Sequence, residues 1–306
     1  MYAPDEIRAY YGRLAARSAA LADQADGFAQ QFPTNRHAAE ARDLNFKLLQ
    51  SAVGLGSTNR VAELEKATAE RIRNTPEETN KFELAQQLLH CAVSGRQYES
   101  DEAMRAELHQ RARQLALDFP HHPEGVNYLF NLAENVPSNQ CVVIAREAIT
   151  LSPDTNFQAT CRGLIHRAEA VGKPLDLKLA LTNGAVLNLE AERGKVLVFL
   201  FWDSSSRFSA KAIWAVDQLY QKHKGKGLAV VGLNFDTDCA KARSLLADAK
   251  VEWPQYFDGL AGGMIQKQFG LRTLPACWIV DKKGVLRDLK VERNPEGLTE
   301  QLLAEP

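Results

Sequence analysis

The sequence lacks a long apolar run and an excess of charge of either sign. Its 306 residues include 37 Lys+Arg and 38 Asp+Glu, so the formal net charge is -1. This balance removes the usual electrostatic basis for binding nucleic acid or an anionic membrane. No window holds the roughly 18–20 apolar residues of a membrane helix. We therefore expect no nucleic-acid partner and no membrane span.

Closely spaced cysteines are also missing. The five cysteines are Cys91, Cys141, Cys161, Cys239 and Cys277, and they form no Cys-x-x-Cys motif. Neither a zinc ribbon nor an adjacent redox dithiol can be built from cysteines at these spacings. We predict no metal site and no cofactor.

What the sequence does contain is a helical half. Over residues 1–171 the apolar residues recur with helical periodicity, beginning with Ile7, Leu14, Leu21 and Phe28 on one helix face. Interleaved small and large apolar residues follow three Pro-containing breaks. They are typical of a tetratricopeptide-like array of helical hairpins, with an irregular helical bundle as the alternative. Further helices are expected over 37–52, 58–73, 77–94, 99–118, 124–134, 139–150 and 155–171.

Near residue 172 the period changes from 3.6 to 2, so residues 172–306 form the second predicted domain. Strands alternate with helices and end in a hairpin, which indicates an open α/β sheet with one antiparallel edge. The Asn183-Gly184 pair predicts a type I′ hairpin. Strands are expected over 176–181, 185–188, 196–202, 228–235, 254–257, 276–281 and 285–292, and helices over 206–223, 239–249, 260–269 and 296–303.

Six segments of this second part occur in a recognisable order. They are Gly172-Lys173-Pro174-Leu175, the strand 194–202 ending in Phe201-Trp202, the segment 230–236, Trp253-Pro254-Gln255-Tyr256-Phe257-Asp258-Gly259, the segment 269–275 ending in Thr273-Leu274-Pro275, and the segment 278–284. Together they resemble the thioredoxin-like proteins of the TlpA/ResA and alkyl hydroperoxide reductase/thiol-specific antioxidant superfamily. The resemblance implies a thioredoxin-like fold for this part and does not extend to the helical half.

The resemblance also locates the redox site of the family. Its members carry Trp-Cys-x-x-Cys at a helix start, where the helix dipole and free backbone N–H groups stabilise a thiolate. An alignment without a gap places Ser206 and Ser209 at the two cysteine positions. Serine forms neither a thiolate nor a disulfide, so we expect dithiol exchange to be absent. Pro275 matches the family's cis-proline, and the backbone of Leu274 would face an extended substrate peptide.

Two other interpretations of these residues stay open. The serines and Arg207 could bind a small anion at the helix start, or Asp203 or a serine could simply cap the helix. A lone reactive thiol at Cys239 or Cys277 would instead retain oxidoreductase activity.

We predict a thioredoxin-like protein that lacks the redox cysteines and binds a protein or peptide rather than acting as an enzyme. The alternatives are an oxidoreductase with a single non-motif thiol and a small-anion binder. The resemblance favours a bacterial extracytoplasmic location if a leader preceding Met1 has been removed. The candidate binding residues are Trp202, Asp203, Ser204, Ser205, Arg207, Phe208, Leu274 and Pro275.

Overall fold

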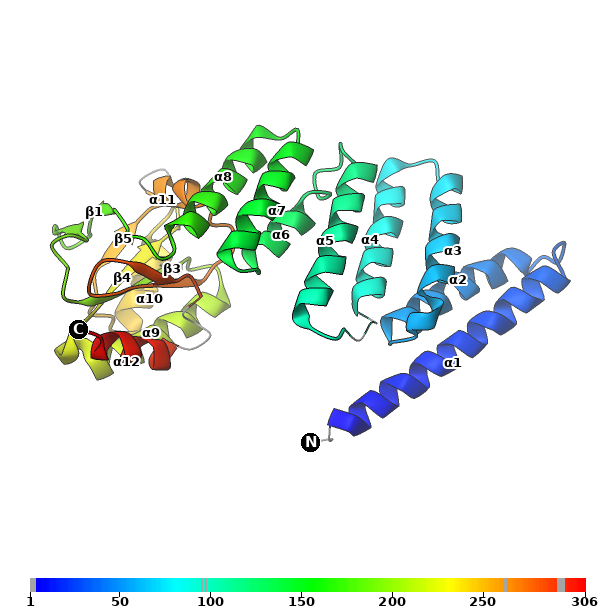
Figure 1. Cartoon of the computed structure of the whole chain (residues 1–306), viewed down its shortest axis with the longest axis horizontal. Helices are drawn as coiled ribbons and strands as arrows, with labels where there is room; N and C mark the ends of the chain where they lie inside the picture. Colours follow the sequence, from blue (N-terminus) through cyan, green and yellow to red (C-terminus); the bar gives the residue numbers. More distant parts are fainter. Residues whose placement is uncertain (1–3, 95, 97, 261–262, 291–294) are drawn as a thin grey trace. The chain divides into compact units, whose positions relative to one another are not determined.

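The structure is a computed structural model that describes residues 4–94, 96, 98–260, 263–290 and 295–306 (Figure 1). It divides into two compact units, Met1–Leu132 and Ala133–Pro306. The expected fold class is confirmed, because helices fill the first half and an α/β sheet follows. The predicted domain division at 171/172 coincides with the change from helices to strands, and as a domain boundary it stays a prediction. None of the described helices is long and apolar enough to cross a membrane.

The first unit is built from helices that pack side by side along the chain. A cluster of Phe46, Leu49, Val53 and Leu64 forms its core between successive helices. The sequence periodicity located the helices to within a few residues. Their bounds are α1 (Pro4–Gln31), α2 (Ala38–Gly54), the short 3-10 turn η1 (Thr58–Arg60), α3 (Val61–Asn74), α4 (Glu78–Ser94), α5 (Asp101–Asp118) and α6 (Asn127–Glu134).

The buried face of α1 differs from the predicted one. Ile7 and Leu21 are 45% and 42% exposed, whereas alanines on α1 are buried. Ile7 and Leu21, which the predicted apolar face included, therefore lie outside the buried face. Close packing of α1 on α2 selects small side chains at the contact, and large apolar residues are left outside it. The buried alanines are Ala15, Ala22, Ala25 and Ala29.

The second unit opens with a helical hairpin and continues into the sheet. The five-stranded sheet has the order β5-β4-β3-β6-β7, in which β3, β4 and β5 are parallel and β6 and β7 form the predicted antiparallel edge. The helices are α7 (Ser138–Leu151), α8 (Thr155–Ala170), α9 (Arg207–His223), the 3-10 turn η2 (Lys224–Lys226), α10 (Ala240–Asp248), α11 (Met264–Gln268) and α12 (Pro295–Ala304). The strands are β1 (Lys178–Ala180), β2 (Val186–Asn188), β3 (Val196–Trp202), β4 (Leu228–Asn234), β5 (Gln255–Phe257), β6 (Ala276–Val280) and β7 (Leu286–Asp288).

Each face of this sheet has its own apolar core. Side chains alternate along β3, so that Phe199 and Phe201 join one core while Val198 and Trp202 join the other. The first core is closed by the β1–β2 hairpin, α11 and the end of α8, and the second by α9, α10 and α12 (Figure 1). All seven residues of β3 are buried, which explains why this segment is an unbroken apolar run.

The β1–β2 hairpin forms at the predicted place but with another turn. Leu181 N–H donates to the Ala185 carbonyl at 2.8 Å, and Gly184 has a φ of 81°. Asn183 is not among the described non-glycine residues with positive φ, whereas a type I′ turn needs two positive φ angles. The loop therefore has three residues, with glycine in the left-handed position, so the type I′ prediction was wrong.

Candidate functional site

The turn after β3 delivers its serines to the start of α9. Ser206 is the N-cap of α9, and its hydroxyl accepts a hydrogen bond from Phe208 N–H at 3.2 Å. Ser206 N–H in turn donates to Asp203 Oδ1 at 2.8 Å. Asp203 Oδ1 also accepts from the backbone N–H and the hydroxyl of Ser205, at 2.9 and 2.6 Å. The helix-capping interpretation is confirmed, and the carboxylate of Asp203 already supplies an anion to this helix start.

A second carboxylate holds the other side of the turn. Ser204 donates to Asp236, from its backbone N–H at 2.9 Å and from its hydroxyl at 3.0 Å. Asn234, the last residue of β4, donates to the same carboxylate at 2.6 Å. The loops after β3 and β4 therefore meet at one sheet edge, because adjacent parallel strands end together there. Nothing in the sequence pattern singled out Asp236 as the residue that fixes the serine turn.

Ser209 is the inner of the two serines that the resemblance places at the family's cysteine positions. It is 1% exposed, and its hydroxyl accepts from Asp203 N–H at 3.3 Å. Trp202 is completely buried, and its indole N–H donates to Gln255 Oε1 at 3.2 Å. These two buried side chains support the turn from its core side. Trp202, predicted as a binding residue, lies in the core and its ring is out of reach of a ligand.

On the outside of the turn, Arg207 and Phe208 are exposed. Phe208 is 54% exposed, and the Arg207 guanidinium lies 4.9 Å from the centre of its ring. The Leu274–Pro275 peptide bond is cis, which confirms the predicted cis-proline. Leu274 and Pro275 are half-buried at the start of β6. β6 pairs with β3 as far as Phe201–Ala276, so Pro275 follows at the level of Trp202.

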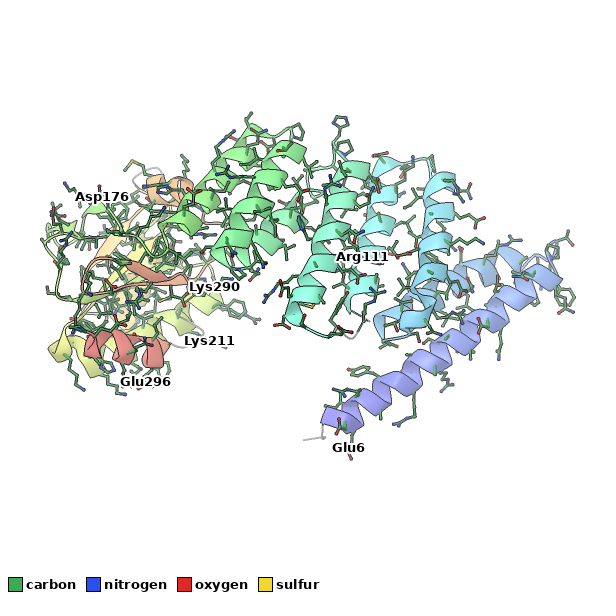
Figure 2. The ribbon with its side chains drawn as sticks, viewed as in Figure 1. Glu6, Arg111, Asp176, Lys211, Lys290 and Glu296 are labelled. Atoms are coloured by element: carbon green, nitrogen blue, oxygen red, sulfur yellow. The ribbon has the colours of Figure 1, made fainter. Side chains whose placement is uncertain are left out.

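A cleft opens beside Pro275, under the hairpin of α7 and α8. Its volume is about 450 Å³. The cis-proline loop contributes Thr273, Pro275 and Ala276 to its lining. The rest comes from the end of α6 and the loop after it, from α7, from α8 and the residue that follows it, and from β7 and the segment after it. Lys290, labelled in Figure 2, donates to the Asn135 side-chain carbonyl at 2.9 Å. The cleft thus combines apolar walls with hydrogen-bonding groups, as binding sites do.

A buried ion pair forms one wall of this cleft. Arg167 on α8 donates to Glu134 Oε1 at 2.8 Å, with side chains only 8% and 12% exposed. Glu134 Oε2 accepts from the Thr273 hydroxyl at 3.3 Å, which links the pair to the cis-proline loop. Sequence reasoning missed both residues, because neither helical periodicity nor spacing relates position 134 to 167 or to 273.

The cysteines are poorly placed for thiol chemistry. Cys239 is 6% exposed at the start of α10, and burial, reinforced by the nearby Asp236 and Asp238, raises the pKa of its thiol despite Arg243. Cys277 is 4% exposed within β6. Low thiol pKa and access are what make a cysteine nucleophilic. Cys239 lacks both, and Cys277 lacks access.

The remaining cysteines are also free thiols. Burial raises the pKa of Cys141 to about 11 and that of Cys161 to about 12. It raises the pKa of the partly buried Cys91 as well. The thiols of Cys91, Cys141 and Cys161 are therefore protonated near neutral pH.

Comparison with known proteins identifies relatives of the C-terminal half. The family model described as Redoxin matches residues 156–304. The thiol-disulfide oxidoreductase ResA of Bacillus thuringiensis subsp. konkukian is 28% identical over 120 residues, which are 39% of this chain and 68% of ResA. Protein DipZ of Mycobacterium bovis is 26% identical over 172 residues, 52% of this chain but only 24% of DipZ. A solved thiol-disulfide oxidoreductase from Bacteroides fragilis matches 42% of this chain and 98% of its own, at 24% identity and a TM-score of 0.37.

Proposed function

We propose that the C-terminal part of the chain does not exchange disulfides and instead binds an extended segment of another polypeptide. This part is a thioredoxin-like domain of the TlpA/ResA type. The observation that carries this proposal is a contrast within one site. The redox turn contains no sulfur and is closed by its own hydrogen bonds, whereas the cis-proline loop beside it lines an open cleft.

The loss of exchange chemistry follows from the two hydroxyls. Disulfide exchange requires a thiolate that attacks a sulfur atom and a second thiol that releases the mixed disulfide. Ser206 instead uses its hydroxyl as a helix cap, and the hydroxyl of Ser209 is buried against Asp203 N–H. The relative ResA is a thiol-disulfide oxidoreductase by name, whereas the turn of this domain has no thiol.

The binding role follows from what the cis-proline loop still offers. Backbone at an open sheet end can pair with an extended peptide, and adjacent pockets then select its side chains. The cleft next to Pro275 is of the size that holds one or two side chains and is lined by polar and apolar groups. Glu134 and Arg167 neutralise each other in its wall, so we expect recognition by shape and hydrogen bonds more than by net charge.

A blocking substitution tests this proposal. A phage-displayed library of unstructured, cysteine-free dodecapeptides is selected on the full chain, and the Kd of enriched peptides is measured by fluorescence anisotropy. Thr273→Trp fills the cleft and is expected to weaken binding by about tenfold or more, because the peptide loses the pocket for its side chain. Thr182→Trp, in the turn before β2, is the matched control and should leave the Kd unchanged. Failure to enrich any peptide, or equal Kd values for Thr273→Trp and wild type, would refute the proposal.

A further inference from the structure

The end of α9 carries a buried histidine, His223, whose ring nitrogens form no hydrogen bond with any described residue. His223 is 2% exposed, and neither Nδ1 nor Nε2 has a hydrogen-bond partner among the residues that the structure describes. A buried polar group without a hydrogen-bond partner destabilises the folded state, so such groups call for an explanation. His223 lies at the opposite end of α9 from the serine turn, and the proposed peptide binding does not use it.

Two carboxylates from α12 face this histidine. Glu296 and Glu300 are four residues apart and therefore lie on one side of the helix. Glu300 Oε1 is 3.7 Å from His223 Nε2, which is too long for a hydrogen bond. One ligand atom from each of His223, Glu296 and Glu300 lies within 4.8 Å of the others. Figure 2 labels Glu296 on α12.

We propose that His223, Glu296 and Glu300 form a binding site for a divalent transition-metal ion of the zinc class. Imidazole and carboxylate are ligands that zinc accepts, at metal–ligand distances of about 2.0–2.2 Å. Tetrahedral geometry at those distances separates two ligand atoms by about 3.4 Å, close to the 3.7 Å between His223 Nε2 and Glu300 Oε1. The other ligand atoms lie within 4.8 Å of one another, so side-chain rotations would bring all three to bonding distance and leave a fourth position to water.

Charge supports a divalent ion over the cation that now faces these carboxylates. Lys222 forms ion pairs with Glu296 and with Glu300, the latter at 3.0 Å. Its single positive charge leaves the two carboxylates with a net charge of -1, and Lys222 leaves both ring nitrogens of His223 without a hydrogen bond. A divalent ion balances both carboxylates and bonds to the imidazole. Because Lys222 is half-exposed, its side chain can move into solvent and open the path to His223.

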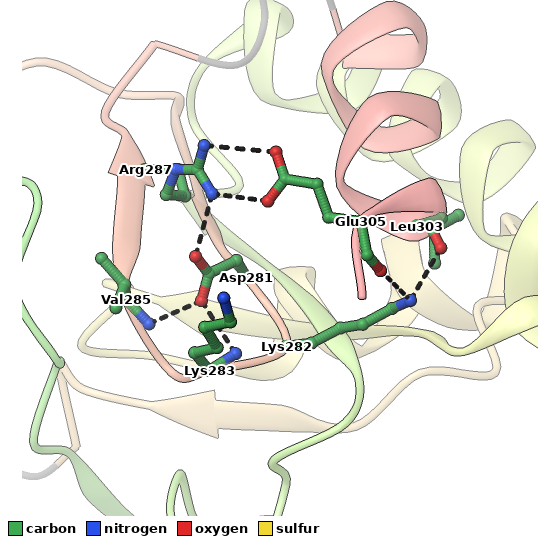
Figure 3. Close-up of polar contacts among 7 residues, drawn as sticks. All are labelled: Asp281, Lys282, Lys283, Val285, Arg287, Leu303 and Glu305. Atoms are coloured by element: carbon green, nitrogen blue, oxygen red, sulfur yellow. Dashed lines mark hydrogen bonds and ion pairs between the residues drawn. The ribbon is translucent and has the colours of Figure 1, made fainter.

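The site would connect the end of α9 to the beginning of α12. The far end of α12 is already held, because Lys282 donates to the carbonyl oxygens of Leu303 and Glu305, and Arg287 pairs with the Glu305 side chain (Figure 3). A metal ion at Glu296 and Glu300 would fix the other end against the second core. We therefore expect metal binding to stabilise the folded second unit.

Calorimetric titration with ZnCl₂ tests this proposal on the full chain after chelator treatment. We expect one high-affinity ion per chain, and a rise in Tm of about 5–10 °C when zinc is at a hundred times its Kd. Glu296→Gln and Glu300→Gln should each weaken binding by about 10- to 100-fold or more, because each removes a ligand. Lys222→Met should strengthen binding, because it removes the competing cation.

Glu252→Gln is the matched control, since Glu252 is also an exposed glutamate paired with a lysine of this region, Lys224 at 2.7 Å. It should leave the zinc affinity unchanged. All four substituted side chains are at the surface, and circular dichroism verifies that the variants fold. The proposal would be overturned if wild type bound no zinc at millimolar concentration. It would also be overturned if Glu300→Gln bound zinc as tightly as wild type and the control Glu252→Gln do.

Discussion

The close approach of α8 to the loop after α11 allows a stability prediction to be worked out atom by atom. A Cβ added at Gly163 would lie 2.4 Å from Gly270 N and 2.8 Å from Lys267 O, where ordinary contacts begin near 3.4 Å. Both obstacles are backbone atoms, so no side chain can rotate away. Gly163→Ala would therefore force α8 and the loop apart by about 1 Å, which for overpacking of this kind costs about 3 kcal/mol.

Part of that cost is offset by the helix itself. Alanine is favoured over glycine in a helix interior by about 1 kcal/mol, so the net loss is about 2 kcal/mol. In a unit of this size each kcal/mol changes Tm by about 2–4 °C, and we expect Gly163→Ala to lower Tm by about 4–8 °C in thermal denaturation followed by circular dichroism. Gly27→Ala is the control, because a Cβ there meets nothing within 4 Å. A Gly163→Ala protein as stable as wild type would refute the close-packing argument.

Three further predictions concern the buried groups of the second unit. Glu134→Ala leaves Arg167 as a buried unpaired cation and should lower the free energy of unfolding, measured by urea denaturation, by about 3–5 kcal/mol. A decrease of less than about 1 kcal/mol would contradict the burial of the pair. Burial raises the pKa of Cys161 to about 12 from an ordinary 9.0, so the fraction of thiolate at pH 8 is roughly 1,000-fold lower than for an ordinary cysteine. A thiol reagent should therefore label Cys161 rapidly only after denaturation. Although burial opposes it, the backbone N–H groups of Val285 and Lys283 and the Arg287 guanidinium hold the pKa of Asp281 below its usual value. That stabilisation is present above about pH 4 and disappears as pH falls through the folded-state pKa, so the Tm difference between wild type and Asp281→Asn should shrink from pH 7 to pH 3; a constant difference would count against it.

The order of the elements could be predicted because each has its own period. The apolar run of β3 and the repeating apolar residues of α9 are local signals, and the observed bounds lie within one residue of the expected ones. The cis bond before Pro275 and the serines at the start of α9 were predicted instead from the resemblance to the thioredoxin-like family. Local sequence specifies the bounds of β3 and α9, so no tertiary contact was needed to find them.

Other features depend on contacts between distant positions, and single-sequence reasoning did not find them. Asp236 holds Ser204 across 32 residues, and Arg167 meets Glu134 across 33. The buried face of α1 was misjudged because helix–helix distance, not hydrophobicity, selected its alanines. Spacing along the chain cannot report such pairs until the fold has brought them together.

The proposed function requires that the domain has lost its exchange chemistry but kept the binding site beside the cis-proline loop. The most direct measurement is the rate of insulin disulfide reduction with dithiothreitol as the reductant, for wild type and for the double variant Ser206→Cys, Ser209→Cys. The variant places a thiol at the N-cap of α9, where the helix start lowers thiol pKa, and a second thiol one turn inside. We predict no catalysis above the dithiothreitol background for wild type and clear catalysis for the double variant. Catalysis by wild type at the rate of the double variant would contradict the account.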